Sequence, residues 1–166
     1  EYGELSFRKD VYIVVPKGTT YRIDLQSKSA WFLLIESQQP IEFAPHYFNR
    51  AGQATLMAPV VETEIEMPQL QPFIDKRGEF PIFVKHAGGK MTKQTLGHHP
   101  FDLSGWEGGL YPFVFDIHNH HGVARAIHTA PPHYQTFQAG NAPYNGFALC
   151  SFVPQVDGWH PKNVPA

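Results

Sequence analysis

The chain has 166 residues, which is enough for one domain or for one domain and part of a second. Of these, 42% are hydrophobic and 14% aromatic, so large rings should supply much of the buried surface. Thirteen basic and fifteen acidic residues give a formal charge of −2, which disfavours nucleic acid and anionic membranes as partners. A single cysteine excludes an internal disulfide framework, and no apolar run approaches the roughly 18 residues of a membrane span. We therefore expect a soluble, cytoplasmic protein.

The first fifty residues show strand patterns separated by turn residues. Residues 11–15 are a short, β-branched run that a Pro-Lys-Gly turn closes. Apolar and polar residues alternate over 21–25, which predicts a half-buried strand. Residues 31–35 are apolar on both faces, as in a central strand, and residues 40–43 predict another short strand.

Prolines and glycines interrupt residues 51–80, where only a brief helical turn near Glu62 to Met67 fits. We expect an extended connecting arm that wraps the body, because proline prevents regular strand ladders and long loops usually have a role. Strand patterns resume after this arm. They fall at residues 81–85, 93–96, 113–117, 123–128, 134–139 and 147–153.

Many short strands with turn residues between them predict an all-β fold, either a sandwich or a barrel. No segment repeats apolar residues at helical spacing over a useful length. Strand-like residues begin near Leu5 and no terminal element closes the chain, so we expect both ends to be cut from a longer protein. The expected parts are a β-domain portion over 1–50, the connecting arm over 51–80, and the start of a second β-region over 81–166.

Asp10, Pro16, Gly18 and Tyr21 have the spacing of the second sequence motif of cupins. In that motif a proline and a glycine shape a tight hairpin, and a histidine points into a β-barrel as a metal ligand. Here Asp10 stands at the position of the first glycine, and Tyr21 at the position of the histidine. A tyrosine without nearby histidines is a poor metal site, so we expect a metal-free structural half of a barrel.

The run His118-Asn-His120-His121 allows two interpretations. On a strand, His118 and His120 would share one face, at the spacing used by many metal sites in β-barrels. Alternatively, residues 119–122 form a polar turn between strands and need no metal. A small metalloprotein built on His118 and His120, with His98 as a further ligand, is therefore one hypothesis.

His98 and His99 are adjacent, so on an extended chain they point to opposite faces and cannot easily bind one ion. We expect a packed histidine that is hydrogen-bonded to Asp102, next to the loop of Trp106. Cys150 lies between apolar residues of a predicted strand, which indicates a buried and unreactive thiol.

His128 is followed by Thr-Ala-Pro-Pro, and the prolines would fix it at a rigid corner where a strand ends. A histidine held in this way titrates near neutral pH and can exchange a proton with a bound phenol. From the residues alone, a buried, hydrogen-bonded histidine without a chemical role is the alternative. His133 is a weaker candidate of the same kind.

These motifs together resemble the homogentisate 1,2-dioxygenase family over nearly the whole chain. The resemblance implies a two-part, cupin-related β-structure that associates into trimers and hexamers. It also implies an enzyme that uses non-haem Fe(II) and O₂ to open the ring of homogentisate, giving maleylacetoacetate in tyrosine and phenylalanine breakdown. The similar segments are Gly3–Leu5, Val15–Arg22, Glu79–Pro81, Val84–Lys85, His98–His118, His128–Phe137 and Cys150–Pro154.

In that family two histidines and a glutamate hold the iron, and a further histidine takes the phenolic proton of the substrate. His128, in its His-x-x-Pro-Pro setting, resembles this further histidine and is the one catalytic residue that the resemblance implies here. The iron-binding motif, a Pro-Tyr-x-His segment with a later glutamate and histidine, would lie beyond Ala166. We therefore expect this chain alone to bind no iron and to open no ring. The alternative is a non-catalytic, cupin-like β-module that acts in binding or assembly.

Overall fold

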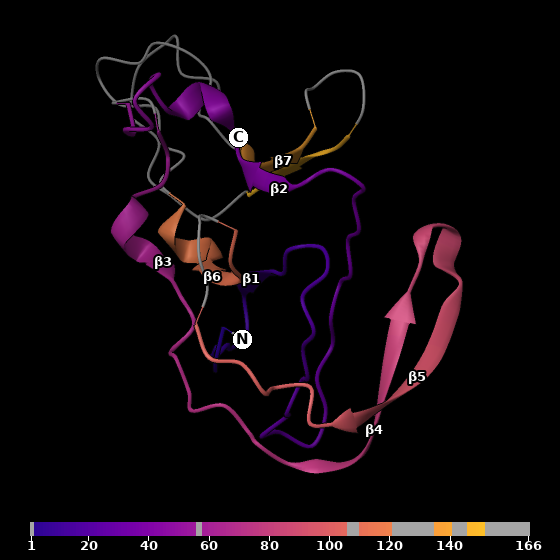
Figure 1. Cartoon of the computed structure of the whole chain (residues 1–166). Coiled ribbons are helices and arrows are strands. Elements are labelled where there is room, and N and C mark those ends of the chain that lie inside the picture. Colours follow the sequence, from indigo (N-terminus) through magenta and orange to yellow (C-terminus); the bar gives the residue numbers. More distant parts are fainter. Residues whose placement is uncertain (1, 56–57, 106–109, 121–134, 141–145, 152–166) are drawn as a thin grey trace, which may run out of the picture.

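The regular structure of this chain is almost entirely β. The computed structural model describes residues 2–55, 58–105, 110–120, 135–140 and 146–151. Within these ranges there are eight short strands and four single-turn 3₁₀ helices (Figure 1). The predicted all-β fold class is thereby confirmed. No helix in the described part of the chain has the length and apolar character that crossing a bilayer requires.

The first sheet has the strand order β1-β6-β3 and is antiparallel. Strand β1 (Val11–Val14) pairs over its whole length with β6 (Phe113–Asp116), and β3 (Ile65–Glu66) pairs with the other edge of β6. The β-branched residues of β1 favour this extended conformation. Strands that are far apart in the sequence therefore form this sheet.

The second sheet has the order β2-β7-β8 and is also antiparallel. Strand β7 (Gln135–Ala139) lies in the middle, between β2 (Ile41–Phe43) and β8 (Ala148–Cys150). The register between β7 and β8 shifts between Gln135 and Phe137, as at a β-bulge. Like the first sheet, this one joins a strand from the first fifty residues to a strand from the second half.

The two sheets contact each other through aromatic rings. Between centroids, the ring of Phe115 in β6 lies 5.4 Å from that of Phe43 in β2 and 6.1 Å from that of Phe137 in β7. Tyr12 of β1 meets Phe137 edge-on at 5.3 Å. Phe115 and Phe137 are fully buried, with Val60 from the arm packed against them. Large rings allow strands of only three to five residues to share a core.

Strands β4 (Arg77–Lys85) and β5 (Met91–His98) form a long hairpin that stands away from the two sheets (Figure 1). The short 3₁₀ helix η3 (Ala87–Gly89) makes the turn between them. Phe80, Ile82 and Val84 of β4 are half-buried and its other residues are exposed, so only one face of the hairpin is partly covered. The strands predicted at 81–85 and 93–96 are confirmed, and both are longer than predicted.

The arm contains the brief helical turn that was predicted, as η2 (Glu62–Glu64). Strand β3 follows η2 directly, and the bridge between Glu4 and Gln69 ties the arm to the N-terminal residues. The division of the chain into 1–50, 51–80 and 81–166 stays a prediction. The pairings add that strands of the first and third parts share both three-stranded sheets.

Two predicted strands are wrong. Residues 21–25 and 31–35 form no strand, and Figure 1 shows residues 16–40 as two long traces between β1 and the β4–β5 hairpin. Their apolar residues alternate or cluster as in strands, but a strand also needs a neighbour in register. No described segment pairs with them, so they stay extended and largely exposed.

The remaining predicted strands are confirmed wherever the structure describes them. They are the strands predicted at 11–15, 40–43, 113–117 and 134–139, together with the described part of 147–153. The strand predicted at 123–128 lies outside the described residues.

Candidate functional site

His128, the predicted catalytic histidine, lies outside the described residues, and so does His133. Buried residues lie close to both ends of the undescribed stretch that carries them. His120, just after β6, and Thr136, in β7, are both fully buried. Since β6 and β7 belong to different sheets, the chain that carries His128 connects the two sheets.

The hairpin motif near the N-terminus forms the turn that was predicted. The backbone N–H of Thr19 donates to the carbonyl oxygen of Pro16 at 3.2 Å, and Gly18 has φ +87°. Asp10, which replaces the first glycine of the cupin motif, also has a positive φ of 64°. Asp10 therefore adopts a conformation that suits glycine best. Tyr21, at the position of the motif's histidine, is exposed.

The histidine run after β6 does not continue as a strand, so the strand interpretation is wrong. Of the turn predicted over residues 119–122, residues 121 and 122 lie outside the described residues. Residues Ile117–Asn119 are the 3₁₀ helix η4, and Asp116 caps it by accepting the backbone N–H of His118 at 2.9 Å. The His118 side chain is exposed whereas His120 is buried, so the two rings do not share a face. His121 lies outside the described residues.

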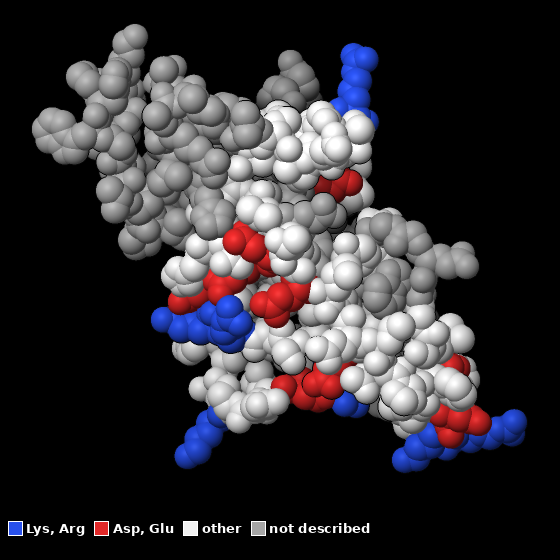
Figure 2. Space-filling model, turned by 90° about the vertical axis from the view of Figure 1, so that its left-hand side faces the viewer, with Lys and Arg blue, Asp and Glu red and all other residues white. Residues whose placement is uncertain are grey.

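Charged side chains surround this turn. The Asp116 carboxylate also accepts from the Arg8 guanidinium at 2.5 Å, and Nε2 of His118 lies 3.8 Å from the carboxylate of Asp10. The His118 N–H in the first place, and Arg8 as well, lower the pKa of Asp116 because they stabilise its charged form. On the face of the molecule that Figure 2 draws, blue basic groups and red acidic groups lie next to each other at the left and lower edges.

The two adjacent histidines at the end of β5 have different surroundings. Nδ1 of His98 lies 2.8 Å from the carboxylate of Asp102, which confirms the predicted bond to Asp102, although His98 itself is exposed. His99 is the packed ring, with Phe80 at 5.0 Å and Phe101 at 5.3 Å. We predicted one histidine with both properties, but His98 makes the bond to Asp102 and His99 is the packed ring.

Three hydroxyl groups meet beside the aromatic core, and no sequence motif pointed to them. The hydroxyl of Tyr12 lies 3.0 Å from Oγ of Ser151, which is also hydrogen-bonded to Oγ1 of Thr136. These residues belong to β1, to β7 and to the position after β8, so the hydroxyls join both sheets. A hydroxyl both donates and accepts, which allows such a group to satisfy itself in a buried place.

Tyr47 and Cys150 interact with each other beside the second sheet. Tyr47 ends the 3₁₀ helix η1 (Pro45–Tyr47) and is buried. Burial, followed by the charge of Cys150, raises the pKa of Tyr47 to about 12, so its phenol stays protonated at neutral pH. The prediction of a buried Cys150 is wrong, because β8 is an edge strand and the residue is exposed.

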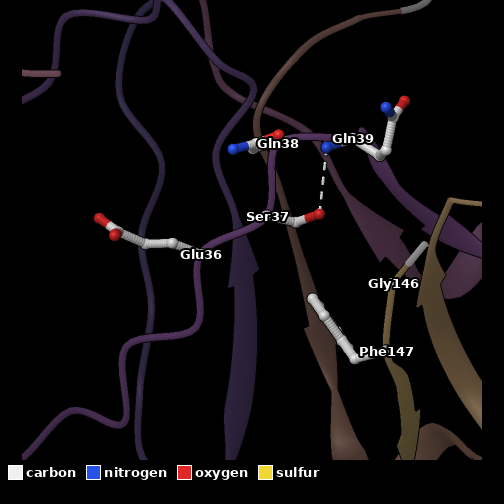
Figure 3. A pocket seen from close by; sticks show the side chains of 6 residues that line it. All are labelled: Glu36, Ser37, Gln38, Gln39, Gly146 and Phe147. Carbon is white, nitrogen blue, oxygen red and sulfur yellow. Dashed lines mark hydrogen bonds between the residues drawn. The ribbon is translucent and has the colours of Figure 1, made fainter. Parts of the chain in front are cut away.

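A polar pocket of about 630 Å³ lies where the chain enters β2 (Figure 3). In the wall of the pocket, Oγ of Ser37 accepts a hydrogen bond from the backbone N–H of Gln39 at 3.1 Å. The Glu36 carboxylate pairs with Lys85 at 2.5 Å. The pocket contains no histidine, and its carboxylate is already paired, so it is suited to neutral polar groups. The lining residues are Glu36, Ser37, Gln38, Gln39, Gly146 and Phe147.

No three His, Cys, Asp or Glu side chains in the described ranges come together as metal ligands do. His98, His118 and His120 therefore form no such group, contrary to the metalloprotein hypothesis. These residues do not fit an iron ion, which needs several such ligands on one side.

Comparison with known proteins identifies a family. A family model described as the N-terminal part of homogentisate 1,2-dioxygenase matches residues 1–117. A protein from Saccharolobus solfataricus that is provisionally named a dioxygenase is 32% identical over 164 residues, which is 99% of this chain and 40% of that protein.

Two relatives carry the name homogentisate 1,2-dioxygenase. The protein from Bradyrhizobium diazoefficiens is 27% identical over 122 residues, which cover 70% of this chain and 25% of the relative. The protein from Emericella nidulans is 27% identical over 168 residues, which cover 96% and 35% respectively. No solved structure matches the chain. The chain thus spans less than half the length of these three relatives. By the match over residues 1–117, this chain belongs to the homogentisate 1,2-dioxygenase family.

Proposed function

We propose that this chain is part of a homogentisate 1,2-dioxygenase, which uses non-haem Fe(II) and O₂ to open the ring of homogentisate to maleylacetoacetate. The observation that carries the proposal is the match of the family model to residues 1–117. Two relatives with this name support it. Homogentisate and O₂ are then the substrates of the enzyme. The enzyme acts in tyrosine and phenylalanine breakdown, in the cytoplasm.

Within this enzyme, His128 accepts the phenolic proton of the substrate. The support is its resemblance to the proton-accepting histidine of the family and the pKa of imidazole, which lies near neutral pH. Bound Fe(II) supplies the redox chemistry with O₂. Because the iron-binding motif of the family would lie beyond Ala166, we place the ligands in sequence that follows Ala166 in the complete enzyme. The 166 residues alone are then inactive.

Oxygen uptake with homogentisate and Fe(II) tests the proposal. The 166-residue chain is compared with a version that extends past Ala166 to the full length of its relatives. Uptake and ring opening are expected in the longer protein alone, because only that protein has the iron ligands. Ring opening by the 166-residue chain would contradict the placement of the ligands. Failure of the longer protein to open the ring would contradict the enzyme itself.

The role of His128 has its own test in the longer protein. His128→Ala should lower kcat by about 10²–10⁴, the usual contribution of a general base, and leave the iron content per subunit unchanged. His118→Ala is the matched control, because His118 is an exposed histidine. Loss of iron in His128→Ala would instead make His128 a metal ligand.

One observation favours a second candidate, a non-catalytic β-module that acts in binding or assembly. Large apolar side chains such as Trp31 and Leu33 are exposed, as on a surface that binds another polypeptide. The family's trimers and hexamers are one form that such assembly takes. Light scattering on the longer protein measures the subunit number, and the oxygen-uptake experiment decides between module and enzyme.

A further inference from the structure

Residues 31–35, Trp-Phe-Leu-Leu-Ile, are the most exposed apolar run among the described residues, and we refer to them as the apolar segment. Trp31 is 99% exposed, Leu33 86% and Leu34 81%. The segment is extended, but no strand ladder and no backbone hydrogen bond to another described residue includes it. The same five residues thus combine exposed apolar side chains with backbone groups that pair with no other described residue.

The composition of the segment is that of a buried central strand. Aromatic, β-branched and leucine side chains occur on both of its faces, whereas a strand with one wet face alternates with polar residues. An extended backbone with unpaired N–H and C=O groups is a template for pairing with another strand. The segment therefore has the side chains and the extended backbone of a central strand, but no described strand lies beside it.

One part of the segment is already held in place. The ring of Phe32 meets that of Phe7 edge-on, 5.9 Å between centroids. Directly after the segment, the Glu36 carboxylate pairs with Lys85 of the β4–β5 hairpin at 2.5 Å. These contacts position the segment without covering Trp31, Leu33 or Leu34.

The charges near the segment indicate what kind of partner fits. Glu36, directly after the segment, is paired with Lys85, so this neighbouring carboxylate already has a cation. The segment itself contains no charged residue. A complementary partner is therefore uncharged and apolar, with a free strand edge.

We infer that the apolar segment is a β-pairing surface that another part of the same polypeptide covers. The occupant is an extended, uncharged, apolar segment from the portion that the relatives have in addition, since this chain covers only 40%, 25% and 35% of them. Pairing would satisfy the backbone groups and bury Trp31, Leu33 and Leu34 at once. The inference rests on the proposal that this chain is part of a longer protein, and not on the proposed reaction.

Hydrogen exchange of the full-length protein, followed by mass spectrometry, tests the pairing. Residues 81–85, which lie in a ladder, provide the slow reference. Residues 27–30, which precede the segment and belong to no strand, provide the fast one. After correction for intrinsic rates, amides of residues 31–35 should exchange at least about 100-fold more slowly than those of residues 27–30. Equal rates at residues 27–30 and 31–35 would overturn the inference, whether or not the enzyme is active.

A crosslinking experiment identifies the occupant. A photoreactive amino acid replaces Leu33 in full-length protein that is assembled from a mixture of ¹⁴N- and ¹⁵N-labelled subunits. Crosslinks within one isotope only are expected, to a segment outside residues 1–166. Mixed-isotope crosslinks would show that a second copy covers the surface. Crosslinks within the 166 residues would show that this chain covers itself, and either result overturns the inference.

A matched pair of variants measures the energetic effect. Leu33→Asp in the full-length protein would bury an unpaired charge, so its melting temperature should fall by at least about 5 °C. Leu103→Asp is the control, because Leu103 is 66% exposed and lies between the polar residues Asp102 and Ser104. Equal melting temperatures of the two variants would contradict burial of Leu33.

Discussion

At the scale of single residues, Asp116 connects three parts of the chain through one carboxylate. It ends β6, caps η4 through the N–H of His118, and binds Arg8 from the N-terminal segment. The pKa of Asp116 is lower in the folded protein than in the unfolded chain. Its stabilising contribution is thus complete above the unfolded pKa near ~4 and is lost as the pH falls through the lower folded pKa.

Two substitutions at Asp116 distinguish its role as the cap of η4 from the effect of its negative charge. Asp116→Asn keeps an acceptor for the His118 N–H but removes the titration, so the free energy of unfolding should fall less steeply below about pH 4 than in the parent protein. Asp116→Ala also removes the acceptor and should cost about 1 kcal/mol more at every pH. Arg8 is mostly exposed, so water screens its ion pair and Arg8→Ala should have only a small effect. Urea unfolding between pH 2.5 and 6 measures all three, and identical pH profiles of Asp116→Asn and the parent would contradict this role.

At the scale of elements, the end of the β7–β8 hairpin is tightly closed. The N–H of Ala139 donates to the carbonyl oxygen of Phe147 at 3.0 Å. A methyl group added at the neighbouring Gly146 would overlap with the carbonyl oxygen of Ala139, which belongs to the backbone and cannot turn aside. Gly97 in β5, by contrast, has no atom within 4 Å of such a methyl group.

The two glycines make a matched pair for alanine substitution, since neither needs a left-handed backbone. Gly146→Ala should lower the free energy of unfolding by about 1–3 kcal/mol through overlap. Gly97→Ala should be neutral or stabilise by up to about 1 kcal/mol, because alanine restricts the unfolded chain more than glycine does. Chemical denaturation compares them, and equal effects would mean that the hairpin end opens readily.

At the scale of the whole molecule, the two three-stranded sheets depend on their shared aromatic core. Phe137 of the second sheet contacts Phe113 and Phe115 of the first, at 6.0 and 6.1 Å between centroids. It also contacts Tyr12 of the first sheet at 5.3 Å. One ring therefore connects β7 to strands β1 and β6 of the other sheet.

Removal of that ring should loosen the contact between the sheets. Phe137→Ala should lower the free energy of unfolding by about 3–5 kcal/mol, because the ring is fully buried. Phe83→Ala is the control, since Phe83 in the β4–β5 hairpin is 67% exposed and should cost less than about 0.5 kcal/mol. Thermal unfolding measures both, and similar losses would show that the core does not lie around Phe137.

The amino-acid sequence alone determined the all-β class and the places of most strands. Turn residues and β-branched runs act locally, so residues 11–15 and 113–117 could be recognised without knowledge of their partners. The turn at Pro16–Gly18 and the bond between His98 and Asp102 are local in the same way. The motifs also sufficed to identify the family.

Only the tertiary structure decided which strands pair and which stay alone. Residues 11–14 and 31–35 have similar strand patterns, but β1 meets β6 across the fold, whereas the apolar segment meets no described strand. The sequence also did not predict that the hydroxyls of Tyr12, Thr136 and Ser151 meet. Nor did it predict that Cys150 is exposed. The physical reason is that ladder hydrogen bonds and burial depend on residues far away in the chain. A local pattern does not show which of those residues the fold brings into contact with it.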